Sequence, residues 1–231
     1  MARKKIVFVI VEGPSDDEAL GLLLTKFFDK NRVYVHITHG DITSEKGITN
    51  SNILLKIGEI VSNYAISNHL TKIHFQEIIH IVDTDGAYVP DTSIIEDILS
   101  EKPVYSLQNI KTANIRGICE RNAQKRKCLD RISTVEKVWG IPYQVYYMSC
   151  NLDHVLYDQM NANDKQKEDN ALYFARKYRE NIPGFVDFIT NSDFSVQGDY
   201  TETWKYIKQE LHSLERHTNL GICVNNCVLH T

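Results

Sequence analysis

Residues 5–28 of this chain read KIVFVIVEGPSDDEALGLLLTKFF and carry the clearest structural signal in the sequence. The part from Lys5 to Val11 is apolar and β-branched, which is typical of a strand buried on both faces of a parallel sheet. Gly13 and Pro14 then form a turn, and apolar side chains recur at helical spacing after polar residues that can cap a helix. The stretch therefore predicts a strand, a tight turn and a helix.

The same alternation continues along the chain. Arg32–Thr38 has the pattern of a second strand, and Ser51–Leu70 carries apolar side chains at helical spacing. Two further buried strands are predicted at Glu77–Val82 and Tyr143–Met148. Strands that alternate with helices are typical of an α/β fold, so we predict a Rossmann-like, doubly wound parallel sheet flanked by helices.

The C-terminal third differs because the strand pattern fades beyond about Asp153. Its periodicity predicts helices at Val155–Gln159, Lys167–Tyr178, Gly184–Thr190 and Tyr200–Leu214. No linker rich in Pro, Gly or Ser separates these helices from the preceding segment. We therefore predict a main α/β domain over residues 1–155 and a helical appendage over residues 156–231 that packs on the same domain.

The composition excludes several classes of protein. With 42% hydrophobic and 24% charged side chains in 231 residues, the chain can bury one sizeable core. Its apolar runs are far shorter than the ~20 residues of a membrane-spanning helix. The five cysteines are scattered, which predicts a protein of the reducing cytoplasm without a disulfide framework. A formal net charge of −4 argues against a protein that coats nucleic acid non-specifically.

Carboxylates follow the predicted strands at the points where these strands end. Glu12 comes directly after the first strand, and Asp83 and Asp85 follow the third. Because ligands of such sheets bind at the carboxyl ends of the strands, we expect these side chains to gather there. Residues two apart in an extended chain point the same way, so Asp83 and Asp85 are expected to face one site. Oxygen ligands of this kind suit Mg²⁺ or Mn²⁺ better than zinc.

The strand followed by E-G-x-x-D at Glu12–Asp16, and the later strand that ends in D-x-D-G, together resemble the Toprim domain. This domain occurs in topoisomerases, DnaG-type primases, small RNases and OLD-family nucleases, and the resemblance covers about residues 5–155. It implies that Glu12 is a general acid or base or a metal ligand. It also implies that the aspartates Asp83 and Asp85 coordinate Mg²⁺.

Two more acidic residues are candidates for a second metal ion. Asp16 stands where OLD-like nucleases have a further acidic residue after the E-G turn, and Asp153 best matches their late acidic motif. The resemblance therefore implies one or two ions, with Glu12, Asp16, Asp83, Asp85 and Asp153 as ligands. The alternative is that Asp16 and Asp153 only cap helices, where acidic residues satisfy free N–H groups.

A basic segment, Arg116–Arg131, lies between the third and fourth predicted strands. We predict that it is a helix whose side chains Arg121, Lys125, Arg126 and Lys127 bind the phosphates of DNA or RNA. The alternative is an ordinary solvated helix face. Some OLD-like nucleases also use a lysine near the metal ions, and Lys125 or Lys127 is a candidate if the helix folds towards the site.

The chain also departs from the family. It has no Walker A pattern, so the ATPase of OLD-type nucleases would be a separate chain, and it lacks the primase and topoisomerase signatures. We predict a metal-dependent nuclease, by analogy the effector of a bacterial defence or toxin system. The alternatives are a non-catalytic module that binds nucleic acid or a nucleotide, and a phosphotransfer enzyme acting on a small nucleotide. A homo-oligomer is compatible with the sequence, which does not decide between DNA and RNA.

Overall fold

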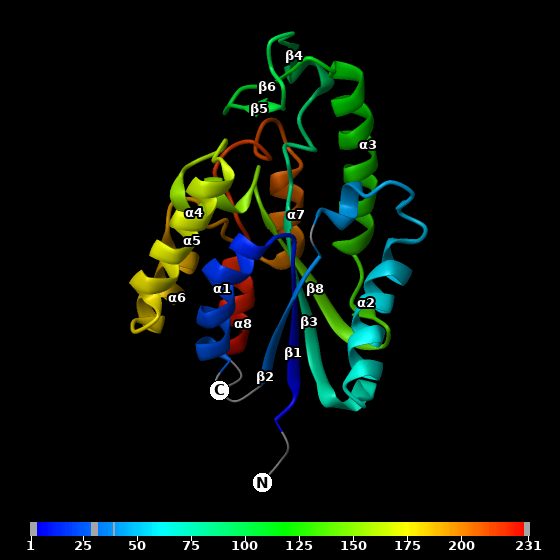
Figure 1. Cartoon of the computed structure of the whole chain (residues 1–231), viewed down its shortest axis with the longest axis vertical. Helices are drawn as coiled ribbons and strands as arrows, with labels where there is room; N and C mark the ends of the chain where they lie inside the picture. Colours follow the sequence, from blue (N-terminus) through cyan, green and yellow to red (C-terminus); the bar gives the residue numbers. More distant parts are fainter. Residues whose placement is uncertain (1–3, 29–31, 39, 229–231) are drawn as a thin grey trace.

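The computed structural model describes residues 4–28, 32–38 and 40–228 (Figure 1). Within these residues the main sheet has five strands, in the order β2 (Arg32–Ile37), β1 (Ile6–Val11), β3 (Phe75–Asp83), β8 (Ile141–Met148) and β7 (Lys137–Val138). The first four run parallel to one another, whereas β7 is antiparallel to β8. The protein is therefore α/β with a mixed, mostly parallel sheet.

The antiparallel strand β7 differs from the wholly parallel sheet that the sequence predicts. Trp139 and Gly140 connect β7 to β8, and their φ angles of 51° and 79° are those of a tight two-residue hairpin turn. With a length of two residues, β7 is too short for an apolar pattern to reveal it.

The described part of the chain also contains eight α-helices and three short 3-10 helices. The α-helices are α1 (Pro14–Phe27), α2 (Ile53–Ser67), α3 (Ile115–Ile132), α4 (Leu152–Tyr157), α5 (Asp164–Tyr178), α6 (Ile182–Asn191), α7 (Tyr200–Ile207) and α8 (Leu220–Val228). The 3-10 helices are η1 (Ile42–Ser44), η2 (Lys72–His74) and η3 (Asp91–Ser93). No helix among the described residues is long and apolar enough to span a membrane.

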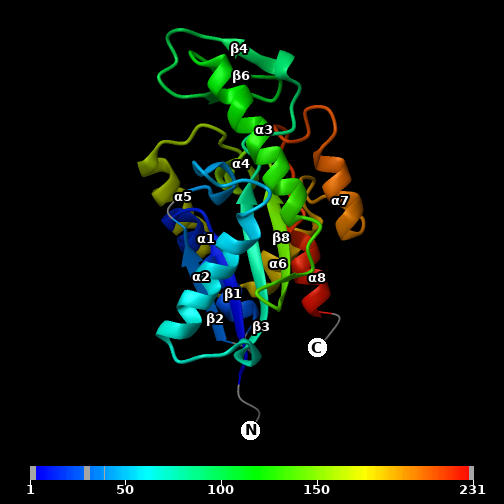
Figure 2. The same cartoon turned by 90° about the vertical axis from the view of Figure 1, so that its right-hand side faces the viewer.

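Helices cover both faces of the main sheet (Figures 1 and 2). Helices α1, α4, α5, α6 and α8 pack on one face, to which β1 contributes Val7 and Val9. Helices α2, α3 and α7 pack on the other face, to which β1 contributes Phe8 and Ile10. All four side chains are fully buried, so β1 has the two-sided burial that its continuous apolar run predicts.

The C-terminal helices divide between the two faces and cover the edge of β8. Where the sequence predicts one helix over Tyr200–Leu214, α7 ends at Ile207 and an irregular segment, residues 208–219, follows. In that segment Asn219 Oδ1 accepts a hydrogen bond from Tyr147 N at 2.9 Å, and Thr218 Oγ1 donates to Tyr147 O at 2.6 Å. β7 pairs only with the start of β8, so the rest of this strand has an open edge on that side. The two side chains hydrogen-bond backbone groups of this edge.

A second, three-stranded sheet lies between β3 and α3 in the sequence, and Figure 1 places it beyond the carboxyl ends of the main strands. Its strand order is β4 (Ile94–Glu96), β6 (Ile110–Thr112) and β5 (Val104–Tyr105). We call this sheet the tip. The side chain of Asn161 ties it to the segment after α4 through hydrogen bonds of 2.9 and 2.8 Å to the main chain of Tyr105. Strands this short carry no pattern, and the sequence does not predict them.

Candidate functional site

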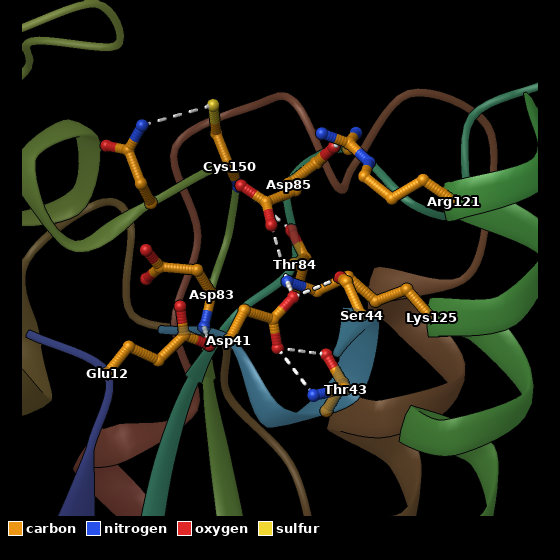
Figure 3. Close-up of polar contacts among 12 residues, drawn as sticks. Glu12, Asp41, Thr43, Ser44, Asp83, Thr84, Asp85, Arg121, Lys125 and Cys150 are labelled. Atoms are coloured by element: carbon orange, nitrogen blue, oxygen red, sulfur yellow. Dashed lines mark hydrogen bonds and ion pairs between the residues drawn. The ribbon is translucent and has the colours of Figure 1, made fainter. Parts of the chain in front are cut away.

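The carboxylates that follow β1 and β3 lie together at one edge of the main sheet (Figure 3). Glu12 directly follows β1, Asp83 is the last residue of β3, and the two strands are parallel neighbours. Glu12 Oε1 accepts a hydrogen bond of 3.2 Å from the backbone N–H of Asp83. The structure thus brings together two residues that are 71 positions apart in the sequence.

Asp85 is held in a sharp turn just beyond β3. Its φ is 48°, a left-handed conformation that is uncommon for residues other than glycine, and Gly86 follows with a φ of 63°. The N–H groups of Thr84 and Asp85 donate hydrogen bonds of 2.9 and 2.8 Å to the carbonyls of Met148, the last residue of β8, and of Cys150 just after it. The turn is therefore fixed by the neighbouring strand.

This turn corrects the expectation that Asp83 and Asp85 point the same way. Strand geometry ends at Asp83, so the alternation of an extended chain does not apply to Asp85. In Figure 3 the carboxylate of Asp83 lies beside Glu12, whereas that of Asp85 is directed at Lys125.

Lys125 and Asp41 complete this group of charges. Lys125 projects from α3, is 0% exposed, and its Nζ lies 2.6 Å from Asp41 Oδ2 and 2.5 Å from Asp85 Oδ2. Asp41 also caps η1, because its carboxylate accepts hydrogen bonds of 2.7 and 2.5 Å from the backbone N–H and the hydroxyl of Thr43, and another from the hydroxyl of Ser44. We call Glu12, Asp41, Asp83, Asp85 and Lys125 the acidic cluster.

Asp41 is not among the residues predicted from the sequence, although a signal was present. Strand β2 ends at the same edge of the sheet as β1 and β3, and Asp41 is the first acidic residue after it. Like Glu12 and Asp83, Asp41 is an acidic residue that follows a strand of the parallel sheet. The half-buried β2 and the polar loop after it concealed the pattern.

The electrostatics of the acidic cluster are unbalanced. Burial raises the pKa of Glu12 well above its usual value, and the carboxylates of Asp41, Asp83 and Asp85 raise it further against the opposing charge of Lys125. Burial likewise raises the pKa of Asp83. Negative charge at these two groups is therefore costly without a further cation.

For Asp41 and Lys125, the ion pairs outweigh the effect of burial on the pKa. Burial alone would raise the pKa of Asp41, but the charge of Lys125 and the hydrogen bonds to the carboxylate outweigh it and lower the pKa to about 2. Burial alone would lower the pKa of Lys125, but Asp85 and Asp41 outweigh it and raise the pKa well above its usual value. Both groups therefore carry their charges at neutral pH.

A second group of charges, Asp16, Asp153 and Lys167, adjoins the acidic cluster through Asp83. Burial raises the pKa of Asp16 to about 6, and the charge of Asp153 adds to this rise. After burial, Asp16 is the main cause of the raised pKa of Asp83. Asp153 lies 3.7 Å from Lys167 Nζ, and its Oδ1 is buried without a hydrogen-bond partner among the described residues.

Both candidates for a second ion, Asp16 and Asp153, therefore lie beside the predicted site. Asp16 also forms the capping box of α1, because its carboxylate accepts a 2.9 Å hydrogen bond from the backbone N–H of Gly13. The capping that the sequence left as an alternative thus exists for Asp16, in addition to its position near Asp83. At α4 the cap is Asn151, whose side chain accepts a hydrogen bond from His154 N.

The basic helix α3 has two different faces. Arg121 is turned inwards, where it donates hydrogen bonds of 2.9 Å to the carbonyl of Asp85 and 2.8 Å to the hydroxyl of Tyr105 in the tip. Lys125 is fully buried and its ammonium group contacts carboxylates, so in this structure it does not belong to the exposed basic face of the helix. Arg126 is partly exposed and Lys127 is exposed, and they remain candidates for contact with nucleic acid.

The oxygen-only donor set of the acidic cluster fits Mg²⁺ or Mn²⁺ in its chemistry, and its excess of negative charge fits a divalent cation. Within residues 4–28, 32–38 and 40–228, however, no set of three or more His, Cys, Asp and Glu side chains is arranged to hold a metal ion as it stands. Comparisons with protein-family models, with curated proteins and with solved structures find no match to this chain.

Proposed function

We propose that this protein is a Toprim-type, metal-dependent nuclease that hydrolyses phosphodiester bonds of DNA or RNA with Mg²⁺ or Mn²⁺. The observation that carries the proposal is the gathering of Glu12, Asp83 and Asp85 at the carboxyl edge of the main sheet, in a cluster with unbalanced negative charge. When bound, the ion would supply a Lewis acid for a phosphoryl oxygen and lower the pKa of a water molecule.

The residues of the cluster have separate roles in this proposal. Asp83 and Asp85 would hold the ion, together with Glu12. Because burial raises its pKa, Glu12 could also take up and release a proton at Oε1 or Oε2. The constantly charged Lys125 holds Asp85 in place, and Asp41 holds Lys125.

A second ion is supported by Asp16 and Asp153, which would bind it together with Asp83. Asp83 interacts electrostatically with both Asp16 and Asp85, so it stands between the two groups of charges. The Oδ1 atom of Asp153, which is buried and has no hydrogen-bond partner among the residues that the structure describes, is the kind of oxygen that a cation would satisfy. By analogy with the resembled family, the nuclease would act in the cytoplasm within a defence or toxin system and with a separate ATPase chain.

A non-catalytic module that binds nucleic acid or a nucleotide is the second candidate. It is favoured by the pairing of Lys125 with Asp41 and Asp85, since an ammonium group already neutralises part of the cluster. Such a module would bind nucleic acid or a nucleotide in the presence of a cation without forming a product.

Incubation of supercoiled plasmid and of labelled single-stranded DNA and RNA with Mg²⁺ or Mn²⁺ tests the proposal. The variants are Glu12→Gln and Asp83→Asn, and Glu59→Gln, an exposed carboxylate on α2, is the matched control. We expect the native protein and the control to cleave, and both site variants to lose cleavage while their circular dichroism spectra stay native. Cleavage that persists in both site variants refutes the site, and cation-dependent binding without cleavage supports the second candidate.

A further inference from the structure

The ammonium group of Lys125 occupies the position in the acidic cluster at which positive charge is needed. It is buried between Asp41, from the loop after β2, and Asp85, from the turn after β3, with distances of 2.6 and 2.5 Å to their Oδ2 atoms (Figure 3). Its charge also acts on Glu12. One lysine thus contacts or influences carboxylates from three different strand ends.

The two carboxylates that hold Lys125 are not equivalent. Asp41 is anchored independently of Lys125, because its oxygens also accept hydrogen bonds from Thr43 and Ser44 in η1. For the carboxylate of Asp85, Lys125 is the only hydrogen-bonding partner in the described part of the chain. The side chain of Asp85 is also the more exposed of the two, at 26% against 15%. Asp85 is therefore the carboxylate that an incoming ion can reach and that Lys125 can release.

An ammonium group and a divalent cation compete for the same carboxylate oxygens. Asp85 Oδ2 is engaged by Lys125, so an ion that takes this oxygen as a ligand competes with the ammonium group for it. The lysine stem is flexible, and contact with the anchored Asp41 can persist while contact with Asp85 is lost.

We propose that Lys125 is a built-in counter-ion of the acidic cluster, which holds Asp85 until a divalent cation displaces it, while Asp41 retains the displaced ammonium group. The inference rests on the cation site of the proposed function and adds its regulation: the lysine lowers the affinity of the site for the ion. The affinity of the site for the ion then depends on competition between the ion and the ammonium group of Lys125 for the carboxylate of Asp85.

Titration of the metal-free, full-length protein with Mn²⁺ in a calorimeter tests this inference. The variant is Lys125→Gln, and the control is Lys127→Gln, which removes the same charge from an exposed position on the same helix. We expect Lys125→Gln to bind Mn²⁺ about tenfold more tightly than the native protein, equal to about 1.4 kcal/mol, because the competitor is gone. The control should stay within about twofold, since exposed charges are screened.

Each outcome has a separate meaning. If the native protein binds Mn²⁺ and Lys125→Gln binds it equally or more weakly, Lys125 only positions Asp85 and the counter-ion role is wrong, while the proposed function stands. If neither the native protein nor Lys125→Gln binds Mn²⁺ at millimolar concentration, the cation site itself is wrong and the counter-ion role is overturned with it.

A measurement on the native protein covers the case in which Lys125→Gln does not fold. The ¹H–¹⁵N signal of the buried Lys125 ammonium group, assigned by its absence in Lys125→Arg, is followed while diamagnetic Mg²⁺ is added. Displacement from Asp85 changes the hydrogen bonding of this group, so its signal should shift in step with binding. A signal that stays unchanged at saturating Mg²⁺ overturns the proposal.

Discussion

Replacement of Lys125 by methionine is expected to lower the free energy of unfolding by about 3 kcal/mol at pH 7 without metal. Removal of one partner from a buried ion pair costs roughly 3–5 kcal/mol, because the other charge is left buried and unpaired. Here two carboxylates lose their partner, but the side chains of Asp41 and Asp85 are 15% and 26% exposed and can be partly hydrated. The lower end of that range is therefore expected.

Urea denaturation followed by circular dichroism, in the presence of a chelator, measures this effect. Lys127→Met is the matched control, because Lys127 lies on the same helix with an exposed side chain, and its effect should stay within about 0.5 kcal/mol. The triple variant Asp41→Asn, Asp85→Asn and Lys125→Met should regain part of the lost stability, since neither Asp41 nor Asp85 is then left as an unpaired charge. A Lys125→Met protein within about 0.5 kcal/mol of the native protein would refute the ion pairs described here.

The same ion pair predicts a dependence on pH. Since the pKa of Asp41 is lowered to about 2 in the folded protein, this carboxylate contributes stability that is fully present above its unfolded pKa of about 4. The contribution is lost as the pH falls from about 4 towards 2. In Lys125→Met the charge that lowers this pKa is absent, so the loss between these pH values should be smaller than in the native protein.

Three further outcomes are expected. Glu12→Gln should raise the melting temperature of the metal-free protein at pH 7. Burial raises the pKa of Glu12 in the folded protein, so its charged form destabilises the fold as the pH rises. A lower melting temperature of the variant would contradict this. Charge reversal at Arg126 and Lys127 should weaken binding of DNA or RNA and flatten its salt dependence, with Mn²⁺ affinity unchanged; unaltered activity would instead favour a small-nucleotide substrate. Asn161→Ala removes both hydrogen bonds to the main chain of Tyr105, so amide hydrogen exchange in the tip should become faster. Unchanged exchange rates would show that other contacts hold the tip.

The sequence determined the features that local patterns encode. The apolar run that ends at Glu12, the turn at Gly13 and Pro14, and the helix after it belong to one continuous stretch, so hydrophobic periodicity and turn chemistry were enough to predict them. The main parallel strands followed in the same way. Because parallel strands end at one edge of a sheet, the proximity of Glu12 and Asp83 was also predictable.

Only the tertiary structure decided how the charges of the site are paired. Lys125 belongs to a helix whose many basic residues look alike in the sequence, yet it is buried, while Lys127 is exposed. Its partners Asp41 and Asp85 lie 84 and 40 positions away. A local pattern shows that a helix has a polar face, but not what that face meets. The packing of α3 against the segments that follow β2 and β3 makes one lysine part of the acidic cluster and leaves its neighbour exposed.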